Sequence, residues 1–163
     1  MKRLQTATVV HHSIPATINN SDMAITNQID TLGFAGGELM VIVQFGAIAG
    51  SAAFDAIKLQ SSDVTGSGFA DVTGCVLGTS TLADGSGTSV LFAGADDDNS
   101  TIVFHVALTE SQKRFFQIVV SENGSQNAVV SSCAILLPGG TDTNSGSANT
   151  ATTGAHQQVL RAS

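Results

Sequence analysis

The chain has 163 residues, a formal net charge of −7 and a charged fraction of 12%, about half of the share in an average globular protein. Its length suits a single domain with an adequate core, and its six scattered Lys and Arg argue against a nucleic-acid interface, which needs clustered basic residues. No apolar run approaches the ~20 residues that span a bilayer, so we expect no membrane segment.

The amino-terminal segment, residues 1–20, is poor in apolar residues and is predicted to be an extended arm. It begins Met1-Lys2-Arg3, like the basic start of a signal peptide, but polar residues interrupt the apolar stretch at once, so we expect no secretory signal. His11 and His12 are adjacent and would face opposite sides of a strand, so they cannot chelate one ion together.

Residues 21–138 repeatedly alternate apolar and other residues with a period of two, which indicates strands, and Gly-rich or Asx-rich turns separate them. Eight or nine strands at this spacing predict an all-β protein with a single β-sandwich or jelly-roll domain. The only helix expected is one turn at Thr109–Lys113. The predicted strands are Thr6–Val10, Met23–Thr31, Glu38–Phe45, Ala53–Gln60, Phe69–Val76, Ser89–Ala93, Ser100–Leu108, Arg114–Val120 and Val129–Leu137.

Two of these strands, Glu38–Phe45 and Val129–Leu137, are apolar on both faces. One face of a sandwich strand packs on the core, and the other normally meets water. We therefore expect both strands to be covered on both faces, as they would be where a subunit interface lies on the outer face of a sheet.

After Pro138 the composition changes, and residues 139–163 form a polar carboxyl-terminal tail. Gly139 to Gly154 consists almost entirely of small and polar residues, which is typical of a flexible linker. The tail closes with a small apolar anchor, Val159-Leu160-Arg161. We expect at least one of the two terminal arms to become ordered only against a neighbouring subunit or a partner protein.

No arrangement of residues predicts catalysis, so the chain is not expected to be an enzyme, and we assign no catalytic, cofactor-binding or metal-binding residue. His105 is expected to be a polar or interface residue on a strand, and no zinc-binding spacing occurs. The acidic run Asp96-Asp97-Asp98-Asn99 supplies oxygen ligands that calcium prefers, but a solvated hairpin tip explains it as well. Cys75 and Cys133 are expected to be free thiols, with a disulfide as the alternative.

Part of the chain resembles a family of small head proteins of tailed bacteriophages, the capsid decoration or cement proteins. The resemblance runs from about Ile25 to Pro138 and rests on short motifs that occur in the same order. They are AIKLQSSD at residues 56–63, a Gly-rich turn, FADVTG at 69–74, the acidic loop at 96–99 and KRFFQIVV at 113–120. The chain departs from the family in having Phe where Tyr is frequent, and in its longer polar tail.

The resemblance implies a β-sandwich virion protein on the exterior of a capsid, assembled in the cytoplasm of a bacterial host. It further implies that the partners are the major capsid protein and further copies of the same chain, commonly as a homotrimer, with no nucleic acid and no membrane. The alternative is a tail-fibre or adhesin-type module that binds a receptor or a carbohydrate. Such a module would use aromatic stacking groups or an ordered cation, and the chain has no Trp and no Tyr.

Overall fold

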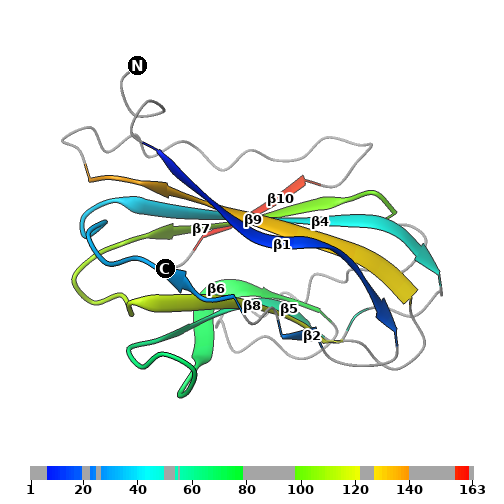
Figure 1. Cartoon of the computed structure of the whole chain (residues 1–163), viewed down its shortest axis with the longest axis horizontal. Helices are drawn as coiled ribbons and strands as arrows, with labels where there is room; N and C mark the ends of the chain where they lie inside the picture. Colours follow the sequence, from blue (N-terminus) through cyan, green and yellow to red (C-terminus); the bar gives the residue numbers. More distant parts are fainter. Residues whose placement is uncertain are drawn as a thin grey trace.

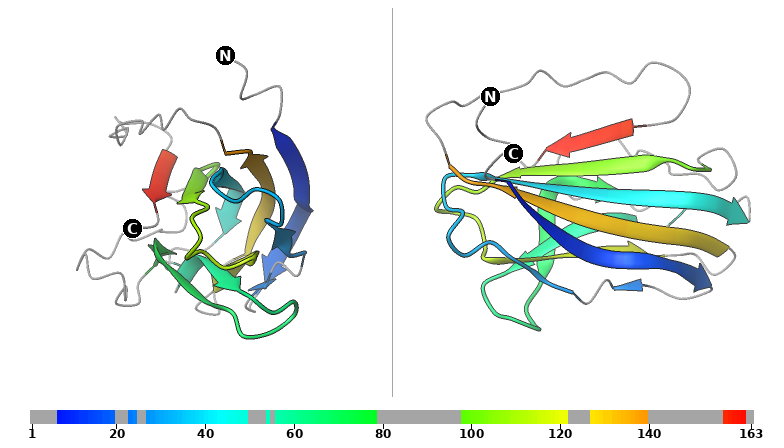
Figure 2. Two further views of the ribbon diagram at one scale, coloured as in Figure 1. Left: turned by 90° about the vertical axis from the view of Figure 1, so that its left-hand side faces the viewer. Right: turned by 45° about the horizontal axis from the view of Figure 1, so that its top comes forward.

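Two β-sheets packed face to face form the part of the chain that the computed structural model describes, and that part contains no helix. The described residues are 7–19, 23–24, 27–49, 54, 56–78, 98–121, 127–139 and 157–161. Figure 1 shows the two sheets as separate layers, and the left-hand view of Figure 2 shows the strands of both sheets end on. The predicted all-β sandwich is confirmed.

Sheet A has the strand order β1-β9-β4-β7-β10. Its neighbours are antiparallel except for β10, which pairs with β7 in parallel. The strands are β1 (Thr8–Asn19), β4 (Glu38–Ala49), β7 (Thr101–Ala107), β9 (Asn127–Leu137) and β10 (Gln157–Arg161).

Sheet B has the order β2-β8-β5-β6, and the short strand β3 also pairs with β8. All of its pairings are antiparallel. The strands are β2 (Met23–Ala24), β3 (Ile29–Asp30), β5 (Ala56–Ser62), β6 (Ala70–Leu77) and β8 (Phe115–Ser121).

The core consists of alternate residues from the facing sides of the two sheets. In β4 the residues Leu39, Val41, Val43 and Phe45 are all buried. They share one face because successive side chains of a strand point to opposite sides. The other large residues that are completely or almost completely buried are Ile29, Phe54, Ile57, Leu59, Leu77, Ile102, Phe104, Phe116, Ile118 and Leu136.

Close backbone packing between two glycine-containing segments holds one end of sheet A. A Cβ atom on Gly37 would overlap the carbonyl oxygen of Leu137 and lie 2.9 Å from the backbone nitrogen of Gly139. The N–H of Gly36 also donates to the carbonyl of Leu108 at 2.7 Å. The chain therefore leaves β9 at a defined place, beside the turn that precedes β4.

The two ends of the chain differ from the extended arms expected from composition. Most of the segment 1–20 belongs to β1, which pairs along β9 from Thr8↔Leu136 to Asn19↔Asn127. The anchor Val159-Leu160-Arg161 lies in β10. The strand predicted at Thr6–Val10 covers only the start of β1, and β10 was not predicted. Edge strands are held by main-chain hydrogen bonds, which polar residues form as well as apolar ones, so composition does not reveal them.

Smaller differences concern turns and boundaries. The helical turn expected at Thr109–Lys113 is a single hydrogen-bonded turn, in which the N–H of Gln112 donates to the carbonyl of Thr109 at 3.0 Å. The expected strand Met23–Thr31 is instead the two short strands β2 and β3. The expected strand Ser89–Ala93 lies outside the described residues. Among the described residues, no helix is long and apolar enough to cross a membrane.

Candidate interaction surface on sheet A

The outer side of sheet A carries a group of apolar side chains, which we call the A face. It follows from the pairing register, because Met40 lies between Ile135 of β9 and His105 of β7, and Ile42 lies between Cys133 and Val103. These residues alternate with the core residues of the same strands. The A face comprises Val9, Met40, Ile42, Val103, His105, Val129, Cys133 and Ile135.

Exposure varies over the A face. Val9 is 67% exposed and Val129 40%, while Met40, Ile42 and Ile135 are half-buried. Val103 is 5% exposed although it does not belong to the core cluster, and its position is the one where β10 joins β7. Strands β4 and β9 are thus apolar on both faces, and their outer faces retain accessible apolar surface.

His105 makes a polar contact with a carboxylate on this face. Its Nε2 lies 3.3 Å from Oε2 of Glu38, and both side chains are about one quarter exposed. The expectation that His105 is a polar or interface residue on a strand agrees with this placement. Among the described residues, no group of three or more His, Cys, Asp or Glu side chains is arranged to hold a metal ion around it.

The outer side of sheet B, which we call the B face, carries a polar ladder across three strands. Gln117 of β8 donates from Nε2 to Oε1 of Gln60 in β5 at 2.9 Å, and Gln60 donates from Nε2 to Oδ1 of Asp71 in β6 at 2.8 Å. Lys58 lies 3.1 Å from the same Asp71 carboxylate. Polar groups that satisfy one another in this way, and that water can reach, do not require a partner protein.

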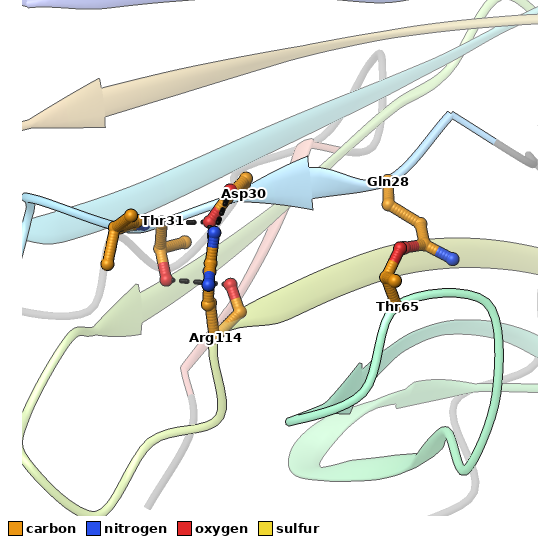
Figure 3. A network of polar contacts seen from close by, with 6 residues as sticks. Gln28, Asp30, Thr31, Thr65 and Arg114 are labelled. Atoms are coloured by element: carbon orange, nitrogen blue, oxygen red, sulfur yellow. Dashed lines mark hydrogen bonds and ion pairs between the residues drawn. The ribbon is translucent and has the colours of Figure 1, made fainter.

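A second polar cluster joins β3 to the start of β8 (Figure 3). Arg114 donates to both carboxylate oxygens of Asp30, at 2.8 Å and 2.7 Å, and its guanidinium lies 4.7 Å from the centre of the Phe115 ring. The hydrogen bond from Arg114 lowers the pKa of the Asp30 carboxyl. Thr31 donates from its Oγ1 and from its N–H to the carbonyl of Arg114. The cluster therefore fixes a strand of two residues to sheet B.

A pocket with a volume of about 450 Å³ lies beside the turn between β5 and β6. The ion pair between Lys113 and Asp63 joins two segments of its lining. The lining is mostly polar and includes Ser62, Asp71 and Gln112, but no aromatic residue.

In the acidic run, the structure describes one carboxylate, that of Asp98, and this carboxylate has a structural role. The N–H of Ile48 donates to Oδ1 of Asp98 at 2.7 Å, and Asn99 adopts a positive φ of 59° while its N–H bonds the carbonyl of Gly46. Asp98 thus caps the irregular end of β4, as a hairpin tip does. Asp96 and Asp97 lie outside the described residues, and within them no three His, Cys, Asp or Glu side chains gather around a metal-sized space.

The two cysteines are free and lie in different sheets. Cys75 of β6 belongs to the core, and burial raises the pKa of its thiol to about 12. Cys133 of β9 is half-buried on the A face. A disulfide between them would require one strand to turn its side chain to the opposite face.

Comparisons of the chain with models of protein families, with curated protein sequences and with solved structures find no match.

Proposed function

We propose that this protein is a structural virion protein of a tailed bacteriophage that decorates the exterior of the capsid and stabilises the head. In this role the A face docks on the major capsid protein and on neighbouring copies, and the B face is turned to solvent. The protein acts without catalysis, cofactor or metal, and it assembles on the particle in the cytoplasm of the bacterial host.

The observation that carries the proposal is the difference between the two outer faces. Lys58, Lys113 and Arg114 all lie on or beside sheet B, where each is paired with a carboxylate. The A face instead presents accessible valine, methionine and isoleucine side chains from its strands, whereas the exposed Leu32 and Val64 lie in turns beside sheet B. Apolar side chains concentrated on one face of a soluble protein mark an interaction surface.

A decoration protein gains affinity from repetition more than from any single strong contact. Engaging several lattice sites at once multiplies modest contacts through effective concentration. A low charge density suits dense packing, because neighbouring subunits then repel one another weakly. Assembly as a cyclic homotrimer, with the same surface used by each copy, is part of the proposal.

The test compares particles assembled with and without this chain, by electron cryomicroscopy and by sedimentation of added protein with undecorated capsids. The key variant is Val9→Glu, and Val64→Glu is its matched control, because the two valines are 67% and 57% exposed. Neither change disturbs the core. We expect Val9→Glu to weaken capsid binding about tenfold, which corresponds to about 1.4 kcal/mol, and Val64→Glu to bind like the unmodified chain. Equal binding by both variants, or no added density on capsids, would refute the proposal.

The alternative function, a receptor-binding or carbohydrate-binding module of a tail fibre or adhesin, would use the polar pocket beside Asp63 and Lys113. Val64 lines that pocket. The same pair of variants therefore separates the two functions, since a pocket-based module would lose binding to cells with Val64→Glu and keep it with Val9→Glu.

A further inference from the structure

Strand β10 differs from every other strand of the described chain in how it joins its sheet. It pairs with β7 in parallel, over five register positions from Gln157↔Thr101 to Arg161↔His105. It forms the edge of sheet A, as the right-hand view of Figure 2 shows. The hydrogen bonds of such an edge strand are main-chain bonds, which any copy of the same strand can form.

The route from β9 to β10 is long. Strand β9 ends level with Glu38 and Ala107, and β10 begins level with Thr101, so the chain has to return along the full length of β7. It also has to pass β4 and β7, which lie between β9 and β10. Three strand spacings and six residues along a strand amount to a separation of roughly 25 Å.

The segment that makes this connection, residues 140–156, contains no large apolar residue. Fully extended, a chain of that length spans at most ~60 Å, more than twice the required separation. The reach is therefore sufficient for β10 to join the β7 edge of its own chain or of an adjacent copy.

We propose that, when copies of this chain are concentrated, β10 leaves its own sheet and pairs with β7 of a second copy, so that the subunits are joined by exchanged carboxyl-terminal strands. The β7 edge is thus an interaction surface, and its occupant is β10 of the next copy in the same parallel register. This inference rests on the proposed function, because neighbouring sites on a capsid bring the copies together.

The balance between the two arrangements depends on concentration. Pairing inside one chain and pairing between chains form the same main-chain hydrogen bonds, so the strand itself does not favour either. The connection along the chain holds β10 near its own β7 at an effective concentration in the millimolar range. Copies spaced a few tens of ångströms apart on a lattice reach the same range. Head-to-tail exchange that closes into a ring adds several such contacts at once, and closure prevents open-ended growth.

Cysteine cross-linking tests the exchange directly. In a Cys133→Ser background, Thr101→Cys and Gln157→Cys place thiols at partner positions of β7 and β10. Chains carrying only Thr101→Cys are mixed with tagged chains carrying only Gln157→Cys, then oxidised, quenched with an alkylating reagent in denaturant and separated on a non-reducing gel. We expect a disulfide between the two different chains, at millimolar concentration and on capsids. The chain carrying both cysteines should give covalent rings, of three copies if the proposed trimer is correct.

The control pair is Thr101→Cys with Arg161→Cys, which is four register positions out of step, or about 13 Å, and should not cross-link. Disulfides formed only within single chains under all of these conditions would overturn the exchange. Absence of any cross-link would overturn it too, because β10 would then pair neither with β7 of its own chain nor with β7 of another copy.

Deleting residues 141–153 gives a second, independent measurement. The six residues that would remain between β9 and β10 span at most ~25 Å, which leaves no length to pass over β4 and β7 within one chain. We expect the shortened chain to be oligomeric in light scattering at every concentration at which it is folded, and a folded monomer would overturn the proposal. Exchange in solution without capsid decoration would refute only the proposed function, whereas full decoration by chains with intrachain disulfides would refute only the exchange.

Discussion

The outer faces of the two sheets differ in how their side chains interact with water. On the B face, Gln117, Gln60 and Asp71 bond one another across three strands, and Lys58 completes the row. On the A face, the equivalent central positions are Met40 and Ile42, which have no polar group to offer to water. A polar face that satisfies itself is stable in solvent, whereas an apolar one gains free energy when a partner covers it. Under the proposed function, the B face is the side of the sandwich that is turned to solvent.

The largest expected difference between the two sheets is in thiol reactivity. At pH 8 a thiol with a pKa of about 12, such as Cys75, is ionised to roughly one part in ten thousand, about a thousandfold less than a free cysteine. We therefore expect a maleimide to modify Cys133 on the A face of the native protein and to leave Cys75 unmodified. Mass spectrometry after timed quenching measures both rates.

Binding to capsids should protect Cys133 if the A face is the docking side. In denaturant without reductant, both cysteines should react. Protection of both under those conditions would reveal a disulfide, and unchanged labelling of Cys133 on capsids would place the contact elsewhere.

The next largest effect should follow from disturbing the end of sheet A. Gly37→Ala places a methyl group against the backbone of Leu137, Phe34 and Gly139, none of which is a flexible side chain. We expect a loss of about 2–3 kcal/mol in the free energy of unfolding and a fall of about 5–10 °C in Tm, measured by calorimetry.

Gly46→Ala in the same strand β4 is the matched control, because its methyl group would lie 3.4 Å from Cβ of Val129, an ordinary contact. Its Tm should remain within about 2 °C of the unmodified protein. Equal effects of the two substitutions would show that the close approach at Gly37 does not hold the end of the sheet.

The smallest effect concerns the exposed ion pair beside sheet B. The pKa of Asp30 is lower in the folded protein than its ordinary value of 3.8, mainly because of the hydrogen bond from Arg114. Its ionised form therefore favours the folded state above about pH 4, and this contribution disappears as the pH falls through the folded-state pKa. Asp30→Asn should lower Tm by no more than about 2 °C at pH 7, since exposed pairs contribute little.

The difference in Tm between Asp30→Asn and the unmodified protein should disappear below pH 4. Arg114→Gln should produce the same small change, and the double variant should produce no further loss. A difference that persists unchanged at pH 2 would mean that Asp30 stabilises the fold by some means other than its charge.

Much of the fold could be predicted from local sequence. Period-two alternation located β4, β7, β8 and β9 to within a few residues, because one buried face requires every second residue to be apolar. The same alternation indicated the A face, since Glu38–Phe45 and Val129–Leu137 are apolar on both faces. The polar B face was missed, although the alternating Lys58 and Gln60 signal a solvated side. Its ladder joins residues up to 57 positions apart, which no local pattern reveals.

By itself, the amino-acid sequence determined the all-β class, the core-facing residues of the central strands and the turns, because these depend on side-chain alternation and on the backbone freedom of glycine. Only the tertiary structure decided which outer face is apolar, that β1 continues to Asn19, that β10 is a strand, and that β10 runs parallel to β7. Edge strands are held by main-chain hydrogen bonds to a distant partner. Their pairing therefore depends on where the chain brings that partner, and not on the residues of the strand alone.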